Sequence, residues 1–406
     1  MKNSIKQPPL RFKNYSNDWI DIRLSELGTT VNGLTYSPSN IVDKGLLVLR
    51  SSNVQEGLLA FEDNVYVDCS VDGHYKTQLN DILICVRNGS RRLIGKCALV
   101  TVPDLNSTHG AFMSIFRGNA NKFVFQLFQT EGYYRQVNAD LGATINSING
   151  KNLLAYKFRI PCIEEQKKIA DFLSTVDKKI SLLKEKHALL EQYKKGVMQK
   201  LFSQEIRFKD ENGNDFPDWK KGTLGDLSDK ISNKNKDESV TNVLTNSAKL
   251  GIVSQTDYFK KDIANQSNLG GYSIVEKDDF VYNPRISELA PVGPIKRNHV
   301  DQGVMSPLYT VFRFKDENVL DYLELYFETT QWHRYMNSIA NFGARHDRMN
   351  ITMGDFFNLP IPVPSIGEME KIVVFIQSLN KKVDLVAQQL EQTQTFKKGL
   401  LQQMFV

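Results

Sequence analysis

Two stretches with helical patterning occur twice in this chain. KKIADFLSTVDKKI (Lys167–Ile180) matches EKIVVFIQSLNKKV (Glu370–Val383), and YKKGVMQKLF (Tyr193–Phe202) matches FKKGLLQQMF (Phe396–Phe405). Both matches keep a single offset of 203 residues. This period is about half of the chain and far longer than that of a solenoid repeat. The sequence therefore indicates a tandem duplication of a whole domain followed by a helix.

The duplication also appears at the two ends of each domain. NDWIDIRLSELG around Trp19 resembles PDWKKGTLGDLS around Trp219, and RFK precedes both segments. Further along, YYRQVNADLGA pairs with WHRYMNSIANFGA. Residues 30–140 and 230–335, which lie between these blocks, resemble each other only faintly. We therefore expect one scaffold that carries two divergent modules.

Apolar residues in the repeated helical blocks recur at alternating steps of four and three residues. A mean spacing of 3.5 residues over several heptads is typical of a coiled-coil seam. The predicted seam contains Ile169, Leu173, Val176, Ile180, Leu183 and Leu190 in the first helix, and Ile372, Ile376, Leu379, Val383, Val386 and Leu390 in the second. We expect the two helices to pair within the chain, so that a helix of ~50 Å holds the modules apart.

Each module has the pattern of a mixed α and β domain. Apolar runs such as GLLVLR, NVYVD, DILICVR, GKCALVTV and AFMSIF predict strands, as do DDFVYNP and SPLYTVFRF in the second module. A helix is expected around Asn121–Val137 and another near Val319–Ser338. The predicted fold class is α+β: two tandem-duplicated α/β domains separated by two long antiparallel coiled-coil helices, with pseudo-two-fold symmetry. The expected segments are a first domain in 1–160, a long helix in 161–203, a second domain in 204–361 and a C-terminal long helix in 362–406.

Basic and polar side chains gather in loops at comparable positions of the two modules. Arginine and lysine neutralise phosphates, arginine can bind guanine O6 and N7, and asparagine can bind adenine. A solvated turn is the alternative for any one loop, but the recurrence in both modules favours DNA. The candidate DNA-binding residues are Arg87, Asn88, Ser90, Arg91, Arg92 and Lys96 in the first module, and Arg285, Lys296, Arg297, Arg345, His346 and Arg348 in the second.

Signatures of catalysis, metal binding and membrane insertion are weak or missing in the sequence. The four cysteines form no CxxC pair and the six histidines form no HExxH motif, so we expect no metal site. GSRRLIGKC (Gly89–Cys97) has the wrong spacing for a phosphate loop and lacks the serine or threonine that binds magnesium. The net charge of +5 decides nothing by itself. No apolar run is long enough to span a membrane and the start lacks a secretory signal, so a cytoplasmic, non-catalytic protein is expected.

The order of the segments and one motif resemble a known family. IPCIEEQKKIADFL (Ile160–Leu173) closely follows the proline-then-glutamate-glutamine helix start of the specificity subunit of type I restriction–modification enzymes. LVLRSSNVQEG (Leu47–Gly57) and LGATINSING (Leu141–Gly150) are also similar to segments of that family's first target-recognition domain. The second copy, SIGEMEKIVVFI, departs from the glutamate-glutamine start. The resemblance covers essentially the whole chain.

This resemblance implies a DNA-binding role within a larger restriction system. Each target-recognition domain would read one half of a bipartite, asymmetric site in double-stranded DNA. The helices would set the spacer and dock two methyltransferase (modification) subunits, to which restriction (translocase/nuclease) subunits add. S-adenosylmethionine, ATP and Mg2+ would belong to those partners, and this chain would bind no cofactor. The alternative is a coiled-coil protein-interaction scaffold without sequence-specific DNA binding.

Overall fold

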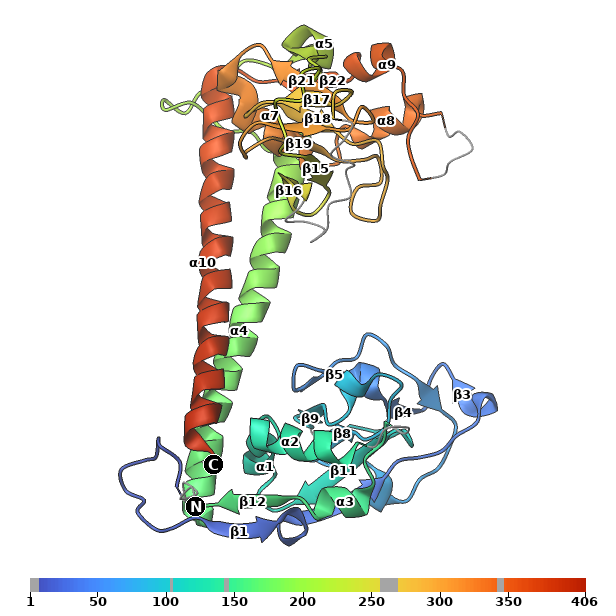
Figure 1. The fold of residues 1–406 in the computed structure, drawn as a ribbon, viewed down its shortest axis with the longest axis vertical. Coiled ribbons are helices and arrows are strands. Elements are labelled where there is room, and N and C mark those ends of the chain that lie inside the picture. The colour runs from blue at the N-terminus through green and yellow to red at the C-terminus, as the bar shows by residue number, and fades with distance from the viewer. Residues whose placement is uncertain (1–6, 103–104, 142–145, 256–268, 342–346) are drawn as a thin grey trace. The chain divides into compact units, whose positions relative to one another are not determined.

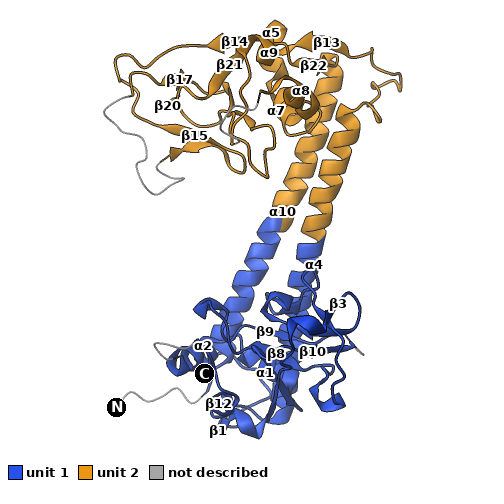
Figure 2. Cartoon of the chain, turned by 90° about the vertical axis from the view of Figure 1, so that its right-hand side faces the viewer, with its two compact units in different colours: residues 1–185, 387–406 blue, residues 186–386 orange. Residues whose placement is uncertain are grey.

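The computed structural model describes residues 7–102, 105–141, 146–255, 269–341 and 347–406. The chain forms two compact units, which are coloured separately in Figure 2. Unit 1 comprises residues 1–185 and 387–406, and unit 2 comprises residues 186–386. Each unit therefore combines one globular domain with parts of both long helices.

The globular part of unit 1 is built from short strands and short α-helices (Figure 1). Its strands are β1 (Ile20–Arg23), β2 (Gly28–Asn32), β3 (Ile41–Val42), β4 (Leu46–Leu49), β5 (Val54–Gln55), β6 (Leu58–Leu59), β7 (Tyr66–Val67), β8 (Ile82–Cys85), β9 (Cys97–Leu99), β10 (Ser107–His109), β11 (Met113–Gly118) and β12 (Lys157–Ile160). Its helices are α1 (Asn121–Leu127), α2 (Glu131–Asp140) and α3 (Gly150–Leu154). Two sheets, ordered β2-β11-β8-β9 and β10-β4-β7-β3, form the framework, and β1 pairs with β12.

The globular part of unit 2 repeats this order of elements. Its strands are β13 (Lys220–Thr223), β14 (Ser228–Ile231), β15 (Leu244–Ser247), β16 (Gly251–Ser254), β17 (Ser273–Val275), β18 (Phe280–Tyr282), β19 (Ile295–Arg297), β20 (Gly303–Met305), β21 (Thr310–Phe314) and β22 (Pro360–Val363). Its helices are α5 (Leu224–Leu227), α7 (Leu320–Phe327), α8 (His333–Ile339) and α9 (Met353–Phe357). The sheet β14-β21-β18-β19 corresponds to β2-β11-β8-β9 of unit 1, and β13 pairs with β22 as β1 does with β12.

The same buried aspartate–arginine ion pair occurs in the middle of each module, although the sequences there match only faintly. In unit 1 the carboxylate of Asp81 is buried, accepts a hydrogen bond from the Gln78 backbone N–H at 2.7 Å and pairs with Arg117 of β11. In unit 2, Asp279 does the same with the Glu276 backbone N–H and Arg313 of β21. The duplication therefore includes the modules and not just their ends and helices.

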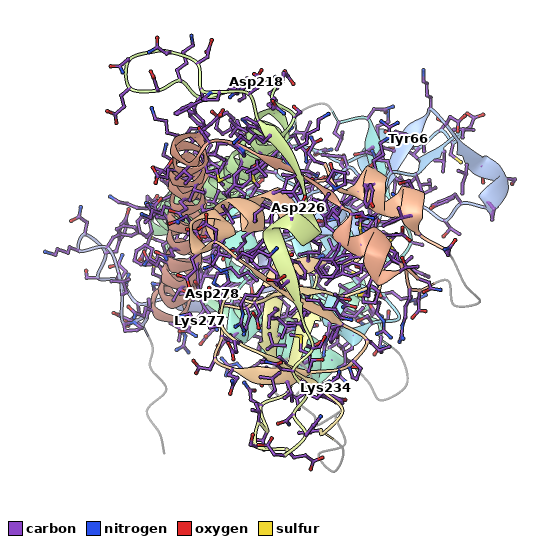
Figure 3. All side chains as sticks on the ribbon, turned by 90° about the horizontal axis from the view of Figure 1, so that it is seen from above. Tyr66, Asp218, Asp226, Lys234, Lys277 and Asp278 are labelled. Atoms are coloured by element: carbon purple, nitrogen blue, oxygen red, sulfur yellow. The ribbon has the colours of Figure 1, made fainter. Side chains whose placement is uncertain are left out.

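The turn before this aspartate is repeated as well. Asn80 in unit 1 and Asp278 in unit 2 both have a positive φ, at 67° and 71°. Both are among the residue types that most readily tolerate the left-handed region. Figure 3 labels Asp278 beside Lys277 on the ribbon of unit 2. The backbone N–H of Asn80 donates to the carbonyl of Val100, and that of Asp278 donates to the carbonyl of Asn298.

Two long helices, α4 (Ile163–Phe202) and α10 (Ile366–Met404), begin two residues after Pro161 and Pro364. At the start of α4 the buried Glu165 forms two hydrogen bonds with Arg11, at 2.9 and 2.7 Å. At the start of α10 the buried Glu368 is held in the same way by Arg207. Glu368 therefore takes the place of Glu165, although the motif around it is less regular. A buried ion pair with an arginine is therefore repeated at the start of both helices.

The long helices pack against each other within each unit. In unit 1, Ile169 and Leu173 of α4 share a core with Leu400 and Met404 of α10. In unit 2, the end of α4 shares a core with the start of α10, including Leu201 and Ile372. The start of one helix meets the end of the other in both cases, so the pairing is antiparallel. All twelve predicted seam residues are buried or half-buried.

The expected α+β fold with two duplicated domains and two long antiparallel helices is confirmed. The predicted strands are present, but each of the two predicted module helices is in fact a pair. Thr130 ends α1 and caps α2, because its Oγ1 donates to the Leu127 carbonyl and accepts from the Tyr133 backbone N–H. Thr329 in unit 2 makes the first of these contacts with the carbonyl of Tyr326. Among the described residues, no helix combines the length and apolar character needed to cross a membrane.

Candidate nucleic-acid interface

Arg87 and Arg285 lie at the same position in the two modules, just beyond β8 and β18. Arg87 forms an isolated antiparallel bridge with Ser147, and Arg285 forms one with Arg348. The residue before each arginine accepts a backbone hydrogen bond from across the bridge, at 2.8 Å for Val86 and 2.9 Å for Pro284. The same pair of bridged segments therefore occurs in both modules, and in each it presents an arginine.

Asparagine side chains stiffen the loops that carry these arginines. In unit 1, Asn88 accepts a hydrogen bond from the Ser90 backbone N–H at 2.9 Å and donates to Ser51 Oγ at 3.1 Å. In unit 2, Asn283 accepts from the Arg285 backbone N–H at 3.0 Å and donates to the Asn246 carbonyl at 3.1 Å. The loops are thus fixed by local bonds, while their arginine side chains point outward.

The basic candidates of unit 1 differ in how firmly they are held. The Arg87 guanidinium lies 5.8 Å from the centre of the Phe112 ring and its Nε donates to Ser147 Oγ at 3.5 Å. Arg91 donates to the Asn138 carbonyl at 3.3 Å. Arg92 is exposed and has no hydrogen bond or ion pair with the part of the chain that the structure describes. Lys96 is half-buried in the turn before β9.

The candidates of unit 2 separate into two groups. Arg285 and Arg348 both place Nε 3.8 Å from the same carboxylate oxygen of Asp347, so they are neighbours at the bridge. Lys296 is half-buried on β19. Arg345 and His346 lie outside the described residues.

Arg297 is better explained as part of the fold of unit 2. Its guanidinium forms ion pairs with Asp278 and Asp321, both at 2.6 Å, and lies 3.6 Å from Glu324. The hydrogen bonds to Asp321 and Asp278 raise its pKa against the opposing effect of burial. Three carboxylates compensate this arginine, which leaves little capacity for a phosphate.

Two exposed apolar side chains beside these turns were not among the sequence candidates. Phe112 precedes β11 and Leu308 precedes β21, and both are more than half exposed. The only sequence signal was that each is the apolar residue at the start of a predicted strand, where a polar turn residue is usual. That signal does not separate them from the buried residues of the same runs.

Titratable groups in the core of unit 1 are shifted mainly by burial. Burial raises the pKa of the Cys97 thiol to about 12 and lowers that of His109 to about 4. His109 Nε2 lies 2.9 Å from the Val31 carbonyl, and its Nδ1 has no partner among the described residues. Within the same residues, no three His, Cys, Asp or Glu side chains form a cluster suited to a metal ion.

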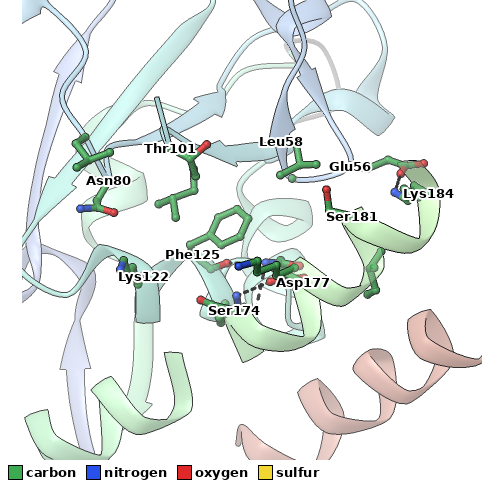
Figure 4. Close-up of a pocket in the computed structure, with 17 residues that line it drawn as sticks. Glu56, Leu58, Asn80, Thr101, Lys122, Phe125, Ser174, Asp177, Ser181 and Lys184 are labelled. Atoms are coloured by element: carbon green, nitrogen blue, oxygen red, sulfur yellow. Dashed lines mark hydrogen bonds and ion pairs between the residues drawn. The ribbon is translucent and has the colours of Figure 1, made fainter. Parts of the chain in front are cut away.

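A cavity of about 530 Å³ in unit 1 is shown in Figure 4, between the strands, α1 and α4. Three of its charged side chains, those of Glu56, Asp177 and Lys184, are already paired. Asp177 accepts a hydrogen bond from Gln126 at 2.8 Å and forms an ion pair with Lys397 of α10, while Lys184 pairs with Glu56. This pairing makes the cavity a structural junction between the domain and the helices.

The model of the type I restriction modification DNA specificity domain matches this chain twice, over residues 16–192 and 217–394. The chain belongs to the type I restriction modification DNA specificity family. The resemblance seen in the helix start is thereby confirmed, and the alternative of a coiled-coil protein-interaction scaffold without sequence-specific DNA binding is not favoured.

Similar members of the type I DNA specificity family span most of this chain. Over 402 residues it is 23% identical to the type I restriction enzyme EcoKI specificity subunit of Escherichia coli, covering 92% of this chain and 84% of that protein. It is 25% identical over 419 residues to the putative type I restriction enzyme MjaX specificity subunit of Methanocaldococcus jannaschii, covering 95% and 92%.

Solved structures agree on the fold. The crystal structure of the S subunit of a type I restriction-modification system from M. genitalium has a TM-score of 0.57 at 16% identity, covering 98% of this chain and 99% of that one. A chain from a study of complex assembly and conformational transition of the type I R-M system has a TM-score of 0.55 at 16% identity, covering 94% and 96%. Both are similar to this chain in fold over nearly the whole length.

Proposed function

We propose that this chain is the DNA-specificity subunit of a type I restriction–modification complex, and that each domain reads one half of a bipartite, asymmetric site in double-stranded DNA. The supporting observation is the repeated turn at Arg87 and Arg285. The two turns have the same backbone bonds but different side chains around them: Ser147 in unit 1, and Arg348 with Asp347 in unit 2. One scaffold with two sets of side chains suits two different half-sites.

The chain selects the site, and a partner carries out the chemistry. Two methyltransferase subunits would bind S-adenosylmethionine and methylate the DNA, and restriction subunits would use ATP and Mg2+. The relatives support this division of labour, because they are named as specificity subunits of restriction enzymes.

The long helices set the spacer and dock the methyltransferase subunits. Support comes from apolar side chains that lie off the buried seam and are exposed. In unit 1 they include Leu182 of α4 and Phe396 of α10, and in unit 2 they include Leu189 of α4 and Leu385 of α10. We infer from these exposed apolar side chains that each unit carries a helix surface for a partner. A helical segment of the methyltransferase fits this surface.

The role is tested by reconstituting the chain with a methyltransferase subunit of a type I system from the same organism and sequencing the methylated positions in randomised DNA. We expect methylation at one bipartite motif, and binding that weakens steeply as salt rises. Methylation without sequence preference, or no salt-dependent DNA binding, would reject the role of specificity subunit.

The spacer is tested by inserting seven residues into α4 between Val176 and Leu190, with a matching heptad at the equivalent place in α10. A heptad preserves the 3.5-residue seam. We expect a longer spacer and unchanged half-sites. Altered half-sites at an unchanged spacer would contradict the role of the helices.

Docking is tested by Leu189→Glu and Leu385→Glu, measured by co-purification with the methyltransferase. Each change puts a charge on an exposed position, so the fold should be retained and the complex weakened. Glu191→Ala, an exposed polar position of the same helix, is the control. Full complex formation by both glutamate variants would place docking elsewhere.

A further inference from the structure

Phe112 and Leu308 occupy matched positions in the two modules. Each is the third residue of a turn that is closed by the same backbone hydrogen bond. The Met113 N–H donates to the Gly110 carbonyl at 2.8 Å, and the Tyr309 N–H donates to the Ser306 carbonyl at 3.0 Å. The strands that follow pair in the same register with the neighbouring strand of their sheets. Phe112 is 58% exposed and Leu308 57% exposed. A large apolar side chain is therefore presented to solvent at the same point of both copies.

Both side chains lie at the edge of the sheet where the matched arginine is found. In unit 1 the backbone N–H groups of Val86 and Arg87 donate to the Phe112 carbonyl, both at 3.0 Å, and the Arg87 guanidinium lies over the Phe112 ring. In unit 2, Thr310 is opposite Tyr282, so Leu308 lies at the end where β18 leads to Arg285. An apolar side chain and an arginine therefore lie at the same end of the sheet in both units, and in unit 1 the two are in contact.

In unit 1 the turn at Phe112 forms one wall of a cavity of about 570 Å³. Tyr36, Arg50 and Ser52 line the cavity as well. The Ser52 hydroxyl and the Arg50 Nε are buried and have no partner among the described residues, although another nitrogen of Arg50 pairs with Asp63 at 2.7 Å. Buried polar atoms without a partner are costly, so a ligand that bonds to them gains affinity. The site therefore offers one exposed ring together with unused polar atoms.

The position of the cavity is fixed by a close backbone approach. The backbone N–H of Leu34 donates to the His109 carbonyl at 2.7 Å, and a Cβ on Gly33 would lie 2.0 Å from the Gly110 carbonyl oxygen. Only glycine permits this contact. The turn at Phe112 is consequently held against the loop at Tyr36 by main-chain geometry.

We propose that Phe112 and Leu308 are matched apolar base contacts, through which each domain obtains part of its discrimination between bases. This inference rests on the proposed function. The phosphates offer negative charge, which favours Arg87 and Arg285, whereas the base faces and the thymine methyl group are the apolar parts of the bases. Bases are therefore the part of duplex DNA that suits an exposed phenylalanine or leucine beside an arginine. The two different side chains suit two different half-sites.

The test uses the full chain in its methyltransferase complex and measures relative methylation rates over a library randomised in both half-sites. For Phe112→Ala we expect discrimination to fall roughly tenfold to a hundredfold at one or two positions of one half-site, with the other half-site unchanged. Leu308→Ala should do the same in the other half-site. Phe112→Leu should retain part of the preference, because it keeps an apolar contact.

Leu79→Ala is the matched control, since Leu79 is 53% exposed and lies before β8, whereas Phe112 and Arg87 lie at the end of β8. Its profile should equal that of the wild type. Both target side chains are exposed, so circular dichroism should show intact folding in all variants. An unchanged profile for Phe112→Ala, or an equal change in both half-sites, would overturn the inference. A wild-type complex without sequence preference would instead reject the proposed function.

Discussion

Arg87 and Arg285 are the same residue in two copies of one turn, but they face different partners across the bridge. Arg87 is opposite Ser147, and Arg285 is opposite Arg348. Backbone hydrogen bonds on either side of the arginine are repeated, from Asn88 to the Asn146 carbonyl and from Ile286 to the Asp347 carbonyl. The backbone therefore fixes where an arginine is presented, and the residue across the bridge changes the charge around it.

Substituting the matched arginines should affect separate half-sites. Arg87→Ala should weaken or relax recognition of one half-site, and Arg285→Ala of the other, each by roughly tenfold or more. The measurement is methylation sequencing of the host or of a randomised library. An effect of either variant on both half-sites would contradict independent reading by the two domains.

Arg297→Ala serves as the contrasting variant in unit 2. It leaves Asp278, Asp321 and Glu324 without their shared cation, so unit 2 should be destabilised. At a temperature where the variant is folded, the base preference should be that of the wild type. A changed preference in the folded variant would return Arg297 to the DNA-contact residues.

The buried aspartates of the repeated aspartate–arginine ion pair should be essential to the stability of their own units. Asp81→Ala removes the partner of Arg117 and the acceptor for the Gln78 backbone N–H, and we expect a loss of about 3 kcal/mol or more in the unfolding free energy. Asp279→Ala should have the same effect on unit 2. Urea unfolding followed with probes in each unit would measure both.

Asp215→Ala is the control for these variants. Asp215 forms an exposed ion pair with Lys209, and such pairs contribute at most about 1 kcal/mol. A loss of unfolding free energy for Asp81→Ala no larger than that for Asp215→Ala would show that the Asp81–Arg117 ion pair does not stabilise the module.

The helices and strands could be predicted because their signal is periodic in the sequence. The spacing of Ile169 and Leu173 predicts a seam, and a run such as DILICVR predicts a buried strand. The repeated aspartate–arginine ion pair could not be found in this way. Asp81 and Arg117 are 36 residues apart, and their counterparts Asp279 and Arg313 are 34 apart, so only the fold brings them together.

The candidate interface was predicted only in part, because the sequence shows residue types but not their packing. Arg87 and Arg285 were named from composition, and the structure places them at one repeated position. Arg297 has the same composition signal, but its compensating carboxylates come from a turn and from α7. Phe112 could not be distinguished from its neighbours, because exposure depends on where the strand begins. Sequence gives the residue type, whereas packing decides which face it presents.

The ion pair between Lys397 and Asp177 should stabilise the helix pairing in unit 1. Lys397 lies one heptad after the seam residue Leu390, is 8% exposed and also donates to Gln129 at 2.5 Å. Asp177→Ala leaves this buried ammonium without its carboxylate, and we expect a loss of about 2–3 kcal/mol. The double variant Asp177→Leu with Lys397→Met should recover much of that loss, because it removes both charges.

Urea unfolding of Asp177→Leu, Lys397→Met and the double variant forms a double-mutant cycle that gives the coupling between the two residues. Lys194→Met is the control: Lys194 is the matched, half-buried position of α4 and has no ion pair with the described residues. Additive losses in the cycle would show that the pair contributes nothing beyond its separate side chains.

The buried His109 should make unit 1 less stable as the pH falls. Burial lowers its folded-state pKa to about 4, below the usual 6.5, so the unfolded chain binds a proton in a range where the folded chain does not. The penalty is small at pH 7 and grows as the pH falls from about 6.5 towards 4. Between pH 7 and pH 5 the expected loss from this group is about 2 kcal/mol.

The measurement is the unfolding free energy of unit 1 at pH 7 and pH 5 for the wild type and His109→Gln. Glutamine does not titrate and can still donate a hydrogen bond towards the Val31 carbonyl, so its variant should lose about 2 kcal/mol less over this range. His74→Gln, at an exposed position, should keep the wild-type dependence. Equal pH dependence in wild type and His109→Gln would mean that His109 is protonated as readily in the folded chain as in the unfolded one.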